Sequence, residues 1–199
     1  MPQLRITLTL ALLLLGLWLP AQDSLLYRLN DQRIRANRTH MYVLGGWALG
    51  NIAAGSVLRA RSTGSARYFH EMNAVWNVVN LGLAAGGLYG SYTSDPAAYG
   101  AWDTYQEQQK LEKILLFNLA LNFTYMTAGA WMQERAKTAS RNPERLKGYG
   151  QSLVLQGGFL LLFDTAQYLR HHSLAAPGLE QLFQHLQAGP GTLGFSVWF

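Results

Sequence analysis

Cysteine is absent from this chain of 199 residues. Disulfide bonds, thiol catalysis and cysteine-ligated metal sites are therefore excluded. Charge is also scarce, because Asp, Glu, Lys and Arg make up 14% of the residues, whereas a soluble domain carries roughly 25%. Hydrophobic residues, in contrast, reach 49% and gather in long runs. This balance favours one membrane domain over a soluble one.

The first 21 residues are predicted to be a signal peptide. Arg5 supplies a basic start, residues 8–19 form a short apolar core, and Pro20-Ala21 precedes a cleavage site. The alternative is an uncleaved first span, although a spanning helix needs about 20 apolar residues. A single domain would then occupy residues 22–199.

Four later segments are predicted to span a membrane: 41–58, 72–92, 114–132 and 148–169. The first three contain no charged residue, and the fourth contains only Asp164. A soluble helical bundle would instead show a charged face on each helix. The predicted fold class is therefore all-α, a membrane four-helix bundle that follows an N-terminal signal peptide.

Basic residues are concentrated in the loops after the first and third of these segments. The first loop carries Arg59, Arg61 and Arg67, and residues 135–147 carry five more Lys and Arg. Short cytoplasmic loops collect Lys and Arg, so both loops are predicted to be cytoplasmic. A cleaved signal peptide gives the same topology. We therefore expect a multi-pass protein of the bacterial inner membrane, with both mature termini on the periplasmic side.

Two amphipathic segments flank the predicted spans on the outer side. Residues 24–38 are expected to lie on the membrane surface. Residues 177–188 are expected to form a separate short helix, whose apolar residues recur at helical spacing. The tail, residues 191–199, is predicted to pack on the bundle.

Two helix starts have recognisable sequence signals. Asn142-Pro143-Glu144 combines a capping residue, a proline at the first helical position and an acid in the first turn. Thr104 with Glu107 predicts a capping box ahead of the third span.

Polar side chains recur on one face of each predicted span, and such side chains usually face inward in a membrane protein. This pattern predicts a polar seam through the bundle. Its members are Asn51, His70, Asn73, Asn77, Asn80, Asn118, Asn122, Tyr125, Gln156 and Asp164. One interpretation is hydrogen bonding between helices, worth about 0.6 kcal/mol per contact. The other is a pathway or pocket for an ion or a small polar solute.

Asp164 is the most informative member of the seam, because a carboxylate within a span costs roughly 2.5–3.5 kcal/mol on insertion scales. It either pairs locally or is protonated, or it forms a proton or cation site with Asn51, Asn77 or Asn122 as neighbours. Small residues also form two stripes that allow close helix approach, Gly46 with Gly50, and Gly82 with Gly86 and Gly90. These stripes are expected to pack inside the bundle, and dimerisation is the alternative.

Four histidines (His40, His171, His172 and His185) are expected on the outer side, near Glu180. No two of them are spaced to share one helix face, so neither a metal nor a cofactor is expected. Nucleic acid is not an expected partner either, because the basic residues separate apolar segments and do not form an aromatic-interleaved patch. The expected partners are the lipid bilayer and other membrane proteins or a second copy.

The stretch from Glu71 to Asn80, with Asn73, Trp76 and Asn77, resembles a helix of small uncharacterised bacterial four-helix membrane proteins. That resemblance implies a signal peptide and four helices, and no activity. The sequence thus favours a non-enzymatic structural or interaction role. The alternatives are a small channel or transporter that uses the seam, and a membrane enzyme or cofactor binder that uses Asp164, His70 and the outer histidines.

Overall fold

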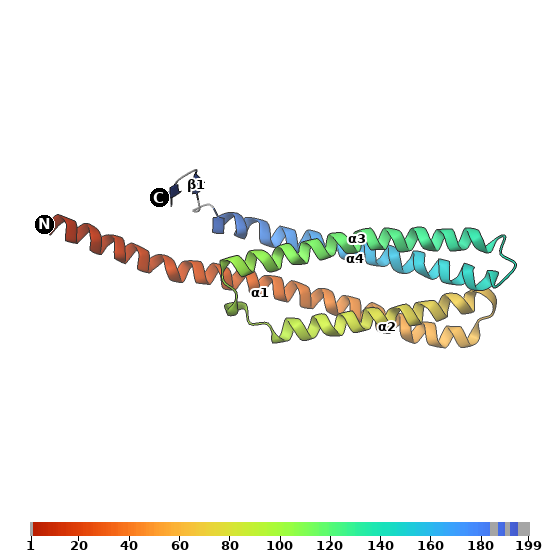
Figure 1. Cartoon of the computed structure of the whole chain (residues 1–199). Helices are drawn as coiled ribbons and strands as arrows, with labels where there is room; N and C mark the ends of the chain where they lie inside the picture. Colours follow the sequence, from red (N-terminus) through yellow and green to blue (C-terminus); the bar gives the residue numbers. More distant parts are fainter. Residues whose placement is uncertain (1, 184–186, 190–191, 195–199) are drawn as a thin grey trace.

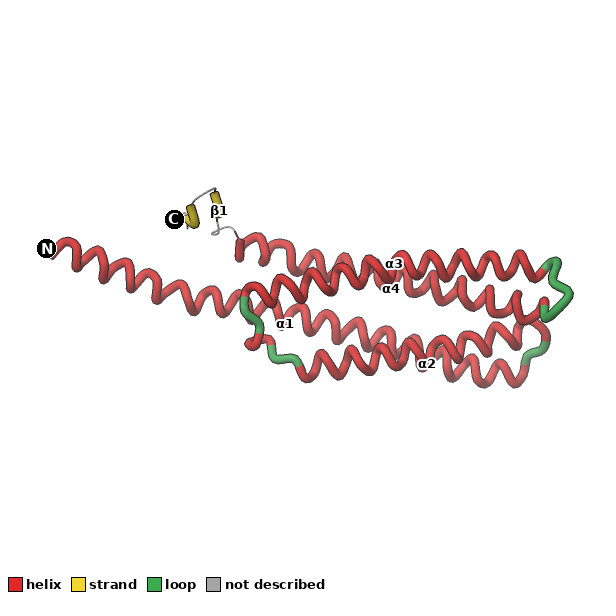
Figure 2. Tube along the Cα trace, viewed as in Figure 1, coloured by secondary structure: helices red, strands yellow, loops and turns green. Residues whose placement is uncertain are grey.

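The computed structural model describes residues 2–183, 187–189 and 192–194. Almost all of them are helical, as Figure 2 shows. The elements are α1 (Pro2–Arg61), α2 (Gly64–Thr93), the short 3-10 helix η1 (Pro96–Ala98), α3 (Ala101–Ala136) and α4 (Pro143–Phe183). Two three-residue strands follow, β1 (Gln187–Gly189) and β2 (Thr192–Gly194), and they pair antiparallel. The four helices confirm the all-α part of the predicted fold class.

The four helices form two hairpins, α1 with α2 and α3 with α4, that lie against each other along a common long axis (Figure 1). Helix α4 also packs against α2 and, less extensively, against α1. Within the described residues, the backbones of α2 and α3 do not approach each other closely. We call the end of the bundle that holds η1 the η1 end. The opposite end, which holds the α1–α2 and α3–α4 loops, is called the basic end.

The turns of the basic end have clear local causes. Gly64 begins α2 with φ of +58°, a left-handed conformation that glycine adopts without steric cost. Asn142 has φ of +54° and precedes α4, whose first residue is Pro143. The start predicted there is confirmed. An asparagine tolerates this conformation better than most residues.

The predicted start of the third helix is wrong in detail. Gly100 is the N-cap of α3, and its backbone N–H donates to the Asp103 carboxylate at 3.3 Å. The Thr104 hydroxyl donates back to the Gly100 carbonyl oxygen at 2.9 Å instead of capping the helix. The capping acid is thus Asp103 and not Glu107.

Residues 24–38 do not form a separate surface segment, so that prediction is wrong. They continue α1 as one helix, and Leu26, Asn30 and Ile34, one helical turn apart, are buried in the bundle. The Arg38 guanidinium donates to the Ser91 carbonyl oxygen on α2 at 2.7 Å. Contacts with α2 and α3 therefore hold this stretch along the bundle. Cleavage after Ala21 stays a prediction.

The predicted separate helix at 177–188 is also wrong, because α4 continues through Pro177 to Phe183. Its last turns pack on α1, since His171, Ala175 and Gly178 are buried on one face and Gly178 lies against Leu29. Of the predicted tail, only residues 192–194 are described, as strand β2. Residues 184–186, 190–191 and 195–199 lie outside the described residues.

Two of the four helices, α1 within Ser24–Arg61 and α3, are long and apolar enough to cross a membrane, judged over the described residues. The most apolar window of each is only 17% buried, whereas the core helix of a soluble protein would be mostly buried. Asparagines on α2 and the polar residues of α4 lower the mean hydropathy of the other two helices. The apolar core is small and centres on Leu44, Ala84 and Phe163.

Candidate functional site

Asn73 on α2 is the centre of a hydrogen-bond network that joins three helices. Its side-chain oxygen accepts from the Ser152 hydroxyl at 2.5 Å and from the Gln156 amide at 3.1 Å, both on α4. The Trp47 indole of α1 donates to the side-chain oxygen of Gln156 at 3.0 Å. Ser152 and Gln156 are fully buried. The predicted seam is therefore a set of interhelical hydrogen bonds in this part of the bundle, which we call the Asn73 network.

The asparagines of α2 extend this network toward the η1 end. The Asn77 amide donates to the backbone oxygen of Asn73 at 2.8 Å, and the Asn80 amide donates to the Asn77 side-chain oxygen at 3.1 Å. Two other predicted members lie apart from it. Asn51 is half-buried and donates to Trp47 O of its own helix, and His70 is half-buried with its ring against Phe69.

A second polar cluster joins α3 to α4. The Asn122 amide donates to the Asp164 carboxylate at 2.7 Å, and Asn118 lines the same cavity. Asp164 is buried, with 6% of its surface exposed. The sequence did place Asn122 next to Asp164. Asn51 and Asn77, its other expected neighbours, belong instead to α1 and to the Asn73 network.

Asp164 and its amide partners line a cleft between α2 and α3, whose backbones do not approach each other closely. The cavity there has a volume of about 260 Å³. Trp76 of α2 and Tyr125 of α3 meet edge-to-face at 4.8 Å across it. The remaining lining residues are Leu44, Val79, Asn80, Leu83, Asn118, Leu121, Asn122, Leu160 and Phe163. The sequence could not predict this opening, because it depends on how the two hairpins dock.

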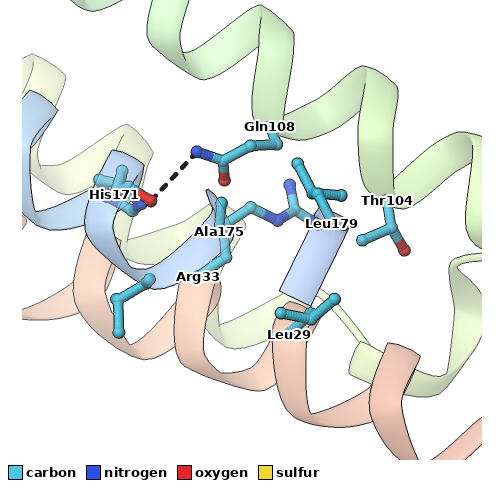
Figure 3. A pocket seen from close by; sticks show the side chains of 8 residues that line it. Leu29, Arg33, Thr104, Gln108, His171, Ala175 and Leu179 are labelled. Atoms are coloured by element: carbon cyan, nitrogen blue, oxygen red, sulfur yellow. Dashed lines mark hydrogen bonds between the residues drawn. The ribbon is translucent and has the colours of Figure 1, made fainter. Parts of the chain in front are cut away.

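A third polar cluster lies at the η1 end, and Figure 3 shows four of its members, Arg33, Thr104, Gln108 and His171. The Asn30 amide of α1 donates to the Thr104 hydroxyl of α3 at 2.8 Å. The Gln108 amide donates to the backbone oxygen of His171 on α4 at 3.3 Å (Figure 3). Arg33 donates to the Asn30 side-chain oxygen at 2.9 Å. These contacts join α1, α3 and α4 beyond the segments predicted to span.

His40 and His171 come together at this end, with ring centroids 5.7 Å apart. His171 is 1% exposed, and neither of its ring nitrogens has a hydrogen-bond partner. Burial, together with the positive charges of Arg33 and Arg170 and the neighbouring His40, lowers the pKa of His171 to about 4. Burial also lowers the pKa of His40. Both imidazoles are therefore neutral at pH 7. This pair was not predicted from the sequence. The available signal was that His40 and His171 each lie just outside a predicted span, on the same side of the membrane.

Two ring nitrogens on neighbouring helices do not make a metal site by themselves. Among the described residues, no group of three or more His, Asp or Glu side chains is placed to hold a metal ion. His172 is exposed and its ring stacks on Tyr168 at 5.7 Å, so it points away from His171.

The glycine stripes do not pack inside the bundle as predicted, and the alternative of dimerisation stays a prediction. A Cβ built on Gly46, Gly50, Gly82, Gly86 or Gly90 would meet nothing within 4 Å. Other glycines form the close contacts. A Cβ on Gly129 of α3 would lie 2.6 Å from the Gly150 carbonyl oxygen on α4, and one on Gly150 would lie 2.5 Å from that of Gly129. The close contacts between helices therefore form at isolated glycines, because a glycine stripe allows close packing only where a second helix lies against it.

Comparisons with known proteins bear on the family and not on the activity. No curated protein matches the chain, and no solved structure does. One family model, described as a family of unknown function, matches residues 43–165, more than half of the chain. The match includes the Asn73 network and the cleft with Asp164, and leaves out His40 and His171. The chain therefore belongs to the family of unknown function DUF6992.

Proposed function

We propose that this chain is a multi-pass membrane protein of four spanning helices with a non-enzymatic, structural or protein-interaction role. One observation carries the proposal: large apolar side chains point outward and polar side chains point inward. Asn77, Gln156 and Asn122 are almost fully buried, whereas Phe117, Leu162 and other large apolar residues are more than half exposed.

Water would drive the opposite arrangement, because burying apolar surface is the dominant favourable term in aqueous folding. In a lipid bilayer apolar side chains lose nothing by facing outward, and polar side chains gain from hydrogen bonds to neighbouring helices. The outward apolar surface includes α2 and α4, whose polar residues lower their mean hydropathy. Examples are Val75 and Val78 on α2 and Leu155, Leu162 and Leu169 on α4.

The charges and aromatic rings at the two ends support an orientation. The basic end carries Arg59, Arg61 and Arg67 and the basic α3–α4 loop, as cytoplasmic loops do. At the η1 end, Tyr89, Tyr92 and Trp102 are exposed, as aromatic side chains are at a membrane interface. We therefore propose that the basic end is cytoplasmic and the η1 end is on the outer side.

The role is proposed as structural because the buried polar groups mainly satisfy each other. The Asn73 network and the Asn30–Thr104 bond join different helices through amide and hydroxyl groups. Groups of this kind specify which helices pair and in which register. The partner we expect is another membrane protein or a second copy of the chain.

Membrane fractionation followed by alkaline extraction tests the proposal, with reporter fusions in both basic loops and after residue 199. We expect the protein to resist extraction, with both loops cytoplasmic and the C-terminus outside. Release into the soluble fraction would contradict membrane insertion, and a basic loop on the outer side would contradict the orientation. A strictly monomeric protein in mild detergent, with no co-purifying membrane protein, would count against the interaction role.

A second candidate function is a small channel or transporter for an ion or polar solute. It is favoured by the cleft between α2 and α3, because a cavity of about 260 Å³ reaches the Asp164 carboxylate there. Loss of solute or ion flux in proteoliposomes on Asp164→Asn substitution, at unchanged expression, is the expected result. Unchanged flux would remove this candidate.

A further inference from the structure

The cleft that holds Asp164 continues toward the η1 end. A second cavity, of about 220 Å³, is lined by residues of α1, α2 and α3. On α2 the lining passes from Leu83 in the first cavity to Gly87 in the second, and on α3 it passes from Asn118 to Ile114. Each step is one helical turn. The two cavities therefore lie end to end along the same cleft.

Polar groups line this cleft along its length. Arg33, Asn37, Ser91, Ser94, Glu107 and Lys110 line the cavity nearer the η1 end, and Glu107 pairs with both Arg33 and Lys110 at 3.5 Å. Asn80, Asn118, Asn122 and Asp164 line the deeper one. The cleft therefore offers hydrogen-bonding groups at each level from the η1 end down to Asp164.

The side of the cleft toward the basic end is closed. Trp76 and Tyr125 meet edge-to-face there at 4.8 Å. Behind them, the Asn73 network fills the space between α1, α2 and α4, and its Gln156 and Ser152 side chains have no exposed surface. The ring contact therefore closes the cleft on its basic-end side.

Hydrocarbon cannot solvate the polar groups of such a cleft. Polar side chains at membrane depth face the protein interior or a water-filled cavity. Water occupies about 30 Å³ per molecule in the liquid, so each cavity has room for several molecules. One buried polar atom of the lining also has no hydrogen-bond partner, Trp76 Nε1.

We propose that the α2–α3 cleft is a water-filled vestibule, open at the η1 end, that brings small hydrated cations to the carboxylate of Asp164. This inference rests on the membrane-embedded bundle proposed above. Asp164 is the one charged residue among those lining the deeper cavity. The two basic residues of the outer cavity, Arg33 and Lys110, are each paired with Glu107, so the charge at the inner end of the cleft favours cations. The carboxylate and the amide oxygens of Asn80, Asn118 and Asn122 are ligands that hard cations prefer.

The natural absence of cysteine allows a direct test with single-cysteine variants. Leu121→Cys lies in the cleft, and Ala120→Cys lies at the same depth on an exposed face of α3 away from it. Leu83→Cys and Ala85→Cys form the corresponding pair on α2. A membrane-impermeant maleimide is added to the η1 side of sealed vesicles. A thiol in lipid stays protonated and unreactive, whereas a thiol in water ionises and reacts.

We expect Leu121→Cys and Leu83→Cys to react at least tenfold faster than their partner variants. No reaction at the two cleft positions would overturn the vestibule, because lipid or another protein segment would then fill the cleft. Equal, fast reaction at all four positions would instead show that the bundle is not embedded in a membrane. That outcome contradicts the proposed function itself, so the two failures are distinguishable.

Binding of a cation at Asp164 is tested with sodium as the only candidate ion. A carbodiimide is applied to the purified protein in sodium chloride or in choline chloride of equal ionic strength. This reagent modifies a carboxyl group, which adds across the C=N bond of the carbodiimide. Mass spectrometry locates the adduct, and Asp164→Asn is the control that cannot form it there. We expect an adduct on Asp164 that sodium suppresses severalfold. Equal modification in both salts would overturn the cation site, and no adduct in either salt would overturn access to Asp164.

Discussion

The close approach of α3 and α4 at Gly129 and Gly150 gives a sharp prediction about stability. In Gly150→Ala, the added methyl group would lie 2.5 Å from the Gly129 carbonyl oxygen and 2.9 Å from Gln133 Cγ. The first of these neighbours is backbone, so relief requires the two helices to move apart. Gly86→Ala is the matched control, because a Cβ there meets nothing within 4 Å.

The expected magnitudes follow from two opposing effects. Replacing glycine by alanine within a helix favours the helix by up to about 1 kcal/mol. Inserting a methyl group into a well-packed contact costs about 1–3 kcal/mol, and the upper end applies where backbone must shift. Gly150→Ala is therefore expected to lower the free energy of unfolding by about 2 kcal/mol. Gly86→Ala is expected to leave it unchanged or to raise it by up to about 1 kcal/mol.

The assay is unfolding of the purified protein in mixed micelles by increasing SDS, followed by circular dichroism and tryptophan fluorescence. The difference between the two variants, about 2–3 kcal/mol, is well above the resolution of such titrations. Equal stability of the two variants would refute the reasoning, because α3 and α4 would then not approach closely at these glycines.

Two further predictions concern buried polar groups. His171 stays neutral in the folded protein down to pH about 4, whereas the unfolded chain takes up its proton near pH 6.5. The unfolded state therefore binds more protons between these values, and stability should fall as the pH falls, by about 3 kcal/mol in total. His171→Phe should flatten that dependence in unfolding titrations at pH 4.5 and 7.5, and an unchanged slope would contradict the assignment. Asn73→Leu removes the acceptor of two buried donors, Ser152 and Gln156, and should cost about 1–2 kcal/mol of stability. Asn51→Leu, which loses only a bond within its own helix, should cost less than about 0.6 kcal/mol in the same titration, and equal losses would argue against the network.

Several features of the bundle were predictable from sequence, because they depend on residues near each other in the chain. The helical segments follow from long apolar runs, and the α4 start follows from Asn142 and Pro143. The inward direction of Asn73, Asn77 and Asn80 follows from their 3-4 spacing on one helix face. Each of these depends on local geometry or on the period of one helix.

The predictions that failed depended on which helices face one another. Residues 24–38 and 177–188 were predicted to be separate segments, but residues 24–38 continue α1 and residues 177–183 continue α4 within the bundle. The repeated glycines of α2 looked like a packing face, but no helix lies against them. The sequence of one helix cannot predict these contacts, because an amphipathic or small-residue face does not specify which other helix packs against it.

The sequence by itself determined that the chain is helical, free of cysteine chemistry and polar along one face of each helix. Periodicity and composition are local properties, so they need no knowledge of the fold. The tertiary structure alone decided that Asp164 meets Asn122, that His40 meets His171, and that Gly129 meets Gly150. It also decided that a cleft stays open between α2 and α3. These pairings depend on how two hairpins dock, and docking is set by side-chain shape over many residues far apart in the chain.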